Sequence, residues 1–520
     1  MTHPHALMIA LGGSMLFGCA EEDPTNRDGD DTAAAEDSAV EDTDTDEPIV
    51  DPEPEAFYDI EEMGITNLGA SPSRVGAVIT VEWDQAFEDP DQQAEAFIEY
   101  TLDGVEWLQT PSQTISAGPQ EIFVVGLPFD SSIDYRPILE YNDQQRIPTE
   151  TYRVATGTYP TNLPSPTLHT RFDDTKFAAG DDYLLGSISE EANGWSTDGN
   201  FWTFIVDRQG QVVWAQKTPN SHRTMQPQRT VDGEGILIDE NSFWMPNTDD
   251  NRQGLEGQIH RVTLDGNIAE TYKTPGLHHP FTQLPDGSIV WGASPLGPSN
   301  EQIEVLPPKK TDGFRESVEI WDCREDFYQI YDLNDKLNCP SNTLVYHEPT
   351  DVFLISFYST STIVEVSRTT GQTLRHWSTD PETMNSPYAF SPANANFEWQ
   401  HGMTFTDQGT LLLSARYTVD PNDNASEKFT VAREYRIDDD NQVLEEIWNF
   451  GFEAPTVYGQ TAGEAERLDN GNTLHNYGSA SRVYEVTQAG EVVWDLRWPQ
   501  NHLLGKTTFL SRDELYQLAP

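Results

Sequence analysis

The chain has 520 residues, and its 30 Lys and Arg side chains against 87 Asp and Glu give a formal net charge of −57 at pH 7. A surface this acidic repels phosphate backbones and excludes a nucleic-acid partner. No apolar run reaches the roughly 20 residues of a membrane-spanning helix, which excludes a multi-pass membrane protein. The 13 Trp, 19 Tyr and 23 Phe residues indicate a folded chain, and its length indicates more than one domain.

Residues 1–19 have the pattern of an export signal. A short apolar stretch ends in Leu-Phe-Gly-Cys at 16–19, followed by Ala20, and this resembles the lipobox of bacterial lipoproteins. The resemblance implies lipidation of Cys19 and an exported protein with a lipid anchor in the bacterial cell envelope, at the outer membrane or cell surface. Because the first five residues contain no Lys or Arg, a plain secretory signal stays open as the alternative.

Residues 20–56 are predicted to be a disordered acidic linker. The part from Glu21 to Glu55 contains 16 Asp and Glu residues and a single basic residue, Arg27. A segment of this composition cannot bury enough apolar surface to fold.

Residues 57–165 contain short apolar segments separated by turns. Strands are expected at 77–83, 97–101, 122–127 and 133–137, with a hairpin turn at 102–104. This spacing predicts an antiparallel β-sandwich. The region resembles a fibronectin type III module at Val81, Trp83, Ile98-Glu99-Tyr100, Gly126-Leu127-Pro128, Tyr135 and Thr156-Gly157.

Residues 180–500 contain a repeated unit. One half is a hairpin ending in an aromatic residue, at 205–214, 261–272, 364–377, 435–448 and 483–494, with a degraded copy at 318–331. The other half is a turn leading into an apolar strand, at 284–291, 406–413 and 468–474, with weaker copies at 231–233 and 347–354. Six copies of about 40–60 residues predict a six-bladed β-propeller. The expected fold is therefore all-β, a sandwich followed by a propeller; one long sandwich is the alternative, and it would not produce the repeat.

The chain has three cysteines. If Cys19 carries the lipid, Cys323 and Cys339 remain, and an oxidising compartment favours a disulfide between them. Two unrelated buried thiols are the alternative. We expect no metal site, since two cysteines without an adjacent histidine supply half a ligand set at most.

Two histidines occupy the same position in the repeat. His279 lies eight residues before Gly287, and His401 lies eight residues before Gly409. Equivalent positions on different blades converge on the axis of a propeller, so both imidazoles are expected in one axial pocket. Arg416, seven residues after Gly409, is expected beside them, and this set would bind a small oxyanion. The alternative is that each histidine only caps a turn.

The same segments resemble the bacterial arylsulfotransferases, at 277–281, 284–287, 398–401 and 414–416. The resemblance implies an exported enzyme with a β-sandwich and a six-bladed propeller. It also implies transfer of a sulfuryl group from a phenolic sulfate ester to a phenol, through a transiently sulfated histidine. His279, His401 and Arg416 would then hold the sulfate oxygens, where the transferring group needs positioned cationic donors. No cofactor is implied, and no glycine-rich loop that would cradle a phosphate is present.

One position departs from that family. Its nucleophilic histidine belongs eight residues before Gly471, and this position is Gly463. His475 is a candidate replacement, although the same offset holds Trp291 and Leu413 in other copies, which favours a role in strand packing.

Two functions therefore remain open. The first is a divergent arylsulfotransferase with a small aryl sulfate and a phenol as substrates. The second is a non-catalytic ligand-binding or scaffold lipoprotein that keeps an anion pocket. His222 is a further pocket candidate, without support from the repeat. A quinone-dependent dehydrogenase propeller is a third reading with no cofactor motif behind it, and a homo-oligomer is left open.

Overall fold

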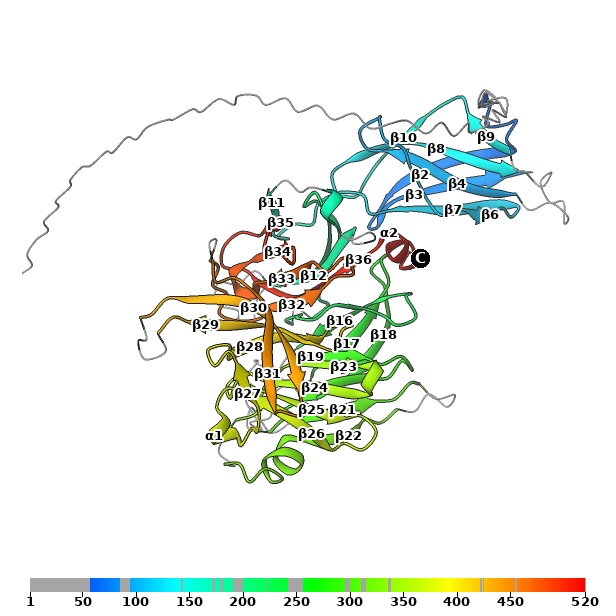
Figure 1. Ribbon diagram of the computed structural model, residues 1–520. Helices are drawn as coiled ribbons and strands as arrows, with labels where there is room; N and C mark the ends of the chain where they lie inside the picture. The colour runs from blue at the N-terminus through cyan, green and yellow to red at the C-terminus, as the bar shows by residue number, and fades with distance from the viewer. Residues whose placement is uncertain are drawn as a thin grey trace, which may run out of the picture. The chain divides into compact units, whose positions relative to one another are not determined.

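The structure is a computed structural model. It describes residues 57–84, 94–141, 144–170, 174–177, 180, 182–189, 200–220, 222–241, 256–294, 300–309, 315–334, 338–420, 423, 425–453 and 456–519. The predicted signal peptide, Cys19 and the acidic linker lie outside these residues. Within them the secondary structure is mostly β-strand (Figure 1), and no helix is long and apolar enough to cross a membrane.

The first part of the described chain folds into two sheets. Its strands are β1 (Phe57–Tyr58), β2 (Ile65–Ser73), β3 (Gly76–Trp83), β4 (Glu95–Thr101), β5 (Leu108–Gln109), β6 (Gln113–Thr114), β7 (Gly118–Val125), β8 (Ser132–Tyr141), β9 (Gln144–Pro148) and β10 (Tyr152–Ala155). One sheet has the order β2-β3-β7, and the other has the order β1-β9-β8-β4-β5, with β10 on β8 and β6 on β4.

The strands expected in this region are confirmed by β3, β4, β7 and β8. The alternating pattern that identified β3 is also the pattern of its burial. Ala77, Ile79, Val81 and Trp83 are buried in one core with residues of β4, β7 and β8, because successive side chains of a strand point to opposite faces.

In the described residues between 167 and 510, six further sheets follow. The first has the order β14-β13-β12-β36, from β12 (Tyr183–Ser189), β13 (Phe201–Asp207), β14 (Val212–Lys217) and β36 (Leu503–Leu510). The second has β15 (Gln228–Arg229), β16 (Ile236–Glu240), β17 (Gln258–Val262) and β18 (Ile268–Lys273). The third has β19 (Leu277–Gln283), β20 (Ile289–Ala293), β21 (Gln302–Leu306) and β22 (Val318–Asp322).

The other three sheets come from the C-terminal half. The fourth has β23 (Ser341–His347), β24 (Val352–Phe357), β25 (Thr362–Ser367) and β26 (Thr373–Ser378). The fifth has the order β27-β31-β30-β29-β28, from β27 (Ala389–Ser391), β28 (Glu398–Phe405), β29 (Leu411–Thr418), β30 (Lys428–Asp438) and β31 (Val443–Phe450). The sixth has the order β11-β35-β34-β33-β32, from β11 (Thr167–Thr170), β32 (Glu464–Arg467), β33 (Thr473–Asn476), β34 (Arg482–Val486) and β35 (Val492–Arg497). Two short α-helices are described, α1 (Pro381–Met384) and α2 (Arg512–Gln517).

Strand β36 completes the first of these sheets from the far end of the chain. It pairs with β12, so that Tyr183 lies opposite Leu510. This strand lies beyond the boundary expected at residue 500. One edge strand from each of the six sheets lines a common cavity of about 480 Å³, namely β15, β19, β23, β28, β32 and β36.

Trp214 and Trp494, which end two of the repeated hairpins, connect successive sheets. The Trp214 indole N–H donates to the Leu264 carbonyl at 2.6 Å, which joins the first sheet to the second. The Trp494 indole N–H donates to the Arg208 carbonyl at 2.9 Å, which joins the sixth sheet back to the first. The aromatic end of the sequence motif is therefore a contact between neighbouring sheets.

The predicted hairpin at 318–331 is wrong. Strand β22 pairs with the preceding strand β21, and the chain then enters a six-residue π-helix, Cys323–Tyr328. The Asp322 side chain starts this helix by accepting from the backbone N–H groups of Arg324 and Glu325, as a helix-capping aspartate does.

Cys323 and Cys339 form a disulfide, with their Cα atoms 6.7 Å apart. The bond joins the π-helix to the segment before β23, and both cysteines are buried in one apolar cluster. Because the bridged residues are 16 apart, replacing both by Ala should lower the free energy of unfolding by about 3 kcal/mol in the entropic model. Urea denaturation of the oxidised wild type and of the double variant measures the loss, and equal midpoints would contradict the prediction.

Candidate functional site

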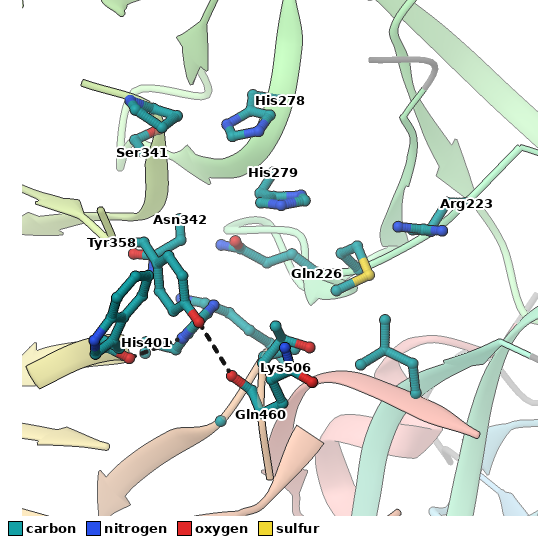
Figure 2. Close-up of a pocket in the computed structure, with 18 residues that line it drawn as sticks. Arg223, Gln226, His278, His279, Ser341, Asn342, Tyr358, His401, Gln460 and Lys506 are labelled. Carbon is teal, nitrogen blue, oxygen red and sulfur yellow. Dashed lines mark hydrogen bonds between the residues drawn. The ribbon is translucent and has the colours of Figure 1, made fainter. Parts of the chain in front are cut away.

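A cavity of about 340 Å³, here called the histidine cavity, contains both histidines that share a position in the repeat. His279 comes from β19 and His401 from β28, and Figure 2 shows the two rings bordering the same space. The structure therefore brings these residues together, as their common position in the repeat predicts. The other polar side chains that line the cavity are Arg223, Gln226, His278, Ser341, Asn342, Tyr358, Gln460 and Lys506.

His401 is held by the chain on one side and by an aromatic ring on the other. Its Nδ1 lies 3.3 Å from the Trp399 carbonyl oxygen. Its ring meets the ring of Tyr358 at a centroid distance of 4.6 Å and an angle of 63°. Burial lowers the pKa of His401 to about 4, so the imidazole is neutral at pH 7.

His279 has a different partner. Its Nδ1 lies 3.4 Å from the side-chain nitrogen of Asn241, and its ring stacks on that of His278 at 4.3 Å between centroids. Burial holds the pKa of His279 well below the ordinary value, and His278, Arg223 and His401 lower it further. This imidazole is also neutral at pH 7.

Two cationic side chains line the same cavity. Arg223 is 5 % exposed, and its backbone pairs with that of Asn241 in an isolated antiparallel β-bridge. Lys506, on β36, lies with its Nζ 3.3 Å from Glu464 Oε1. Two positive charges thus line one cavity in a chain that is otherwise strongly acidic.

Neither Arg223 nor Lys506 is predicted by the sequence pattern. His222, which was predicted as a pocket residue, is not among the residues that line the cavity. The next residue, Arg223, lines it instead. Lys506 lies in the strand that completes the first sheet, beyond the last repeat. The one sequence feature that could have drawn attention to Lys506 is the scarcity of lysine, since the whole chain has eight.

Arg416 does not line the histidine cavity. Its guanidinium lies over the Trp399 indole, 4.5 Å from the ring centroid, with Nη2 3.9 Å from Glu398 Oε2. It lines a separate cavity of about 480 Å³, and Trp399 lines both cavities. The strand pairing explains the separation: Ser414 lies opposite His401, whereas Arg416 lies opposite Glu398, about 7 Å further along β29.

Gly463 contributes only backbone to the cavity wall. A Cβ at this position would meet Ser414 Oγ at 2.7 Å. His475 lies behind this wall on β33, fully buried, with Nε2 3.1 Å from Ser414 Oγ and its ring 4.1 Å from that of Tyr477. Burial lowers the pKa of His475 to about 3. His475 is not among the lining residues and packs in the sheet, as its offset in the repeat indicated.

The walls of the histidine cavity suit an aromatic ligand with a charged end. The rings of Tyr358 and Trp399 meet edge to face at 4.6 Å between centroids, and aromatic faces and edges of this kind pack well on a further ring. In the described part of the chain, no group of three or more His, Cys, Asp or Glu side chains could hold a metal ion.

Comparisons with known proteins identify one segment and a set of similar folds. No curated protein matches the chain. A protein of unknown function from Bacteroides caccae is similar, with 13% identity and a TM-score of 0.37 over 60% of this chain and 94% of that one. A virginiamycin B lyase from Staphylococcus aureus has 13% identity and a TM-score of 0.35 over 66% of this chain and 100% of that one.

The β-propeller domain of Cps50 (Swd1) from Myceliophteria thermophila has 13% identity and a TM-score of 0.36, over 66% of this chain and 88% of that one. TM-scores of this size carry no argument about function.

The family model described as Arylsulfotransferase (ASST) matches residues 340–508, a segment that includes Tyr358, Trp399, His401, Gly463 and Lys506. Residues 340–508 of this chain are therefore similar to the arylsulfotransferase family.

Proposed function

We propose that this protein transfers a sulfuryl group from a phenolic sulfate ester to a phenol in the histidine cavity. The observation that carries the proposal is that two neutral imidazoles, two cations and two aromatic side chains line one cavity. A family-matching segment supplies most of its wall. The transferred group carries its charge on peripheral oxygens, which need positioned cationic donors.

Each side chain has a role in this proposal. Arg223 and Lys506 balance the charge of the sulfate group. Tyr358 and Trp399 pack against the aryl ring of the donor or the acceptor. The neutral imidazoles of His279 and His401 exchange a hydrogen bond or an electron pair with the sulfuryl group.

The proposal also includes the architecture and location. The six sheets between 167 and 510 are taken as the blades of one six-bladed propeller, because one edge strand of each lines a common cavity. The two sheets of residues 57–155 are taken as the fibronectin III-like sandwich. The lipobox at 16–19 supports export and a lipid anchor at Cys19.

The test is a transfer assay with purified protein, a chromogenic aryl sulfate as donor and phenol in excess as acceptor. We expect chromophore release to increase with phenol concentration and phenyl sulfate to appear in equal amount. Release without dependence on phenol would indicate a hydrolase instead. No release at any phenol concentration would overturn the proposal.

A non-catalytic aryl-sulfate-binding protein is the second candidate, favoured by one observation. Gly463 lacks a side chain at the position that the family resemblance assigns to the nucleophile. For this candidate, calorimetry should detect binding of the aryl sulfate while the transfer assay stays flat.

A further inference from the structure

The two imidazoles of the histidine cavity differ in which nitrogen carries the proton. In His401, Nδ1 faces a carbonyl oxygen, that of Trp399, at 3.3 Å. A carbonyl can only accept, so Nδ1 must carry the proton. The neutral ring then has its lone pair on Nε2.

In His279 the assignment is the reverse. Nδ1 faces the side-chain nitrogen of Asn241 at 3.4 Å. The orientation of that amide is set by the His278 carbonyl, to which the same nitrogen donates, since the amide oxygen there would oppose another acceptor. Nδ1 of His279 therefore accepts, and its proton lies on Nε2. His279 can donate a hydrogen bond to a sulfate oxygen but offers no lone pair from Nε2.

The remaining imidazoles are less suited to attack a ligand. His278 lines the cavity but stacks on His279 and is 3 % exposed, so its ring is the less accessible of the two. His475 lies behind the wall made by Gly463, with its Nε2 on Ser414 Oγ. Position 463 itself cannot take a side chain without moving Ser414, because a Cβ there would meet Oγ at 2.7 Å.

We infer that His401 Nε2 is the atom that accepts the sulfuryl group, in place of the histidine absent at position 463. The inference rests on the proposed function. The Nε2 lone pair attacks sulfur, the N–S bond forms, and the bond from sulfur to the aryl oxygen breaks, so that phenolate leaves. The ring becomes an N-sulfo-imidazolium, and its Nδ1–H continues to donate to the Trp399 carbonyl oxygen.

The second half of the reaction returns the enzyme to its starting state. The oxygen of the acceptor phenol attacks sulfur, the N–S bond breaks, and the electron pair returns to Nε2. The acceptor's proton passes through water to the phenolate released in the first half. His279 and the two cations bind the sulfuryl oxygens throughout and form no bond to sulfur.

The experiment locates the adduct on the wild type. The purified protein is mixed with a chromogenic aryl sulfate in the absence of phenol, digested at neutral pH to preserve the acid-labile N–S bond, and mapped by mass spectrometry. We expect one sulfuryl group on the peptide of His401, and its loss when phenol is added. This arm needs no variant and so does not depend on a variant's folding.

Matched variants provide the second arm. His401→Ala should lose the adduct and at least about 10³-fold of the transfer rate, as removal of a nucleophile does, and free imidazole should restore part of the release. His279→Ala should keep the adduct on His401, with a raised KM and no rescue by imidazole.

The outcomes separate the inference from the proposed function. An adduct on His279, or transfer by His401→Ala at a rate near that of the wild type, overturns the inference and leaves the proposed function standing. A wild type that neither releases chromophore nor forms an adduct overturns both.

Discussion

Replacing Arg223 by Gln should lower kcat/KM for aryl sulfate transfer by about 10²-fold, which is the usual cost of removing one preorganised donor to a developing negative charge. Arg223 is 5 % exposed and lines the histidine cavity. Its positive charge acts on the cavity, since it contributes to lowering the pKa of His279. Steady-state rates with a chromogenic donor and phenol measure the loss.

Arg416 supplies the matched control. The sequence places it among the sulfate binders, whereas the structure places it over the Trp399 indole, beside Glu398, where it lines a separate cavity. Arg416→Gln should therefore change kcat/KM by a few-fold at most, through its stacking on Trp399. A large loss for Arg416→Gln with little effect of Arg223→Gln would show that the cation assignment is wrong.

Periodicity made much of the fold and part of the site predictable. The hairpins ending in Trp214, Trp377, Trp448 and Trp494 lie where the repeat puts them. The common position of His279 and His401 in that repeat was enough to place both in one cavity, because edge strands of different sheets line a common space.

The cations were not predictable in this way, for three physical reasons. The prediction for Arg416 is wrong because a strand advances about 3.3 Å per residue. Arg416 is two residues beyond Ser414, which lies opposite His401, and its side chain is therefore past the cavity. Arg223 lies on an isolated bridge outside the repeated hairpins. Lys506 lies on β36, which joins β12 across most of the chain length, a pairing that no local pattern records.

The pH dependence of stability can decide whether His475 is a packing residue or a reacting group. His475→Gln keeps a polar side chain that can bond Ser414 but removes the imidazole. At pH 8 the variant should unfold at slightly lower urea than the wild type, by about 1 kcal/mol, because packing against Tyr477 is lost. It should retain sulfuryl transfer, since His475 lies behind the cavity wall; a variant that folds but transfers nothing would make His475 a reacting group instead.

As the pH falls, the difference in stability between the two proteins should shrink to zero and then change sign, so that at pH 4.5 the variant is the more stable protein by about 2 kcal/mol. Burial lowers the pKa of His475 from 6.5 to about 3, so below pH 6.5 the unfolded chain binds a proton there that the native state does not. Stability therefore falls with pH, and by pH 4.5 this one group costs the wild type about 3 kcal/mol that the variant does not lose.

Other buried groups titrate in the same window and in both directions. His401 destabilises the native state at low pH in the same way, whereas burial raises the pKa of Glu301 to about 7 and that of Asp239 to about 6, which stabilises it. These groups are common to both proteins, so they cancel in the difference between them. Urea denaturation of wild type and His475→Gln at pH 8, 6 and 4.5 gives that difference directly. A difference that stays constant with pH would mean that His475 has the same pKa in the folded and the unfolded protein, and the buried packing role would be wrong.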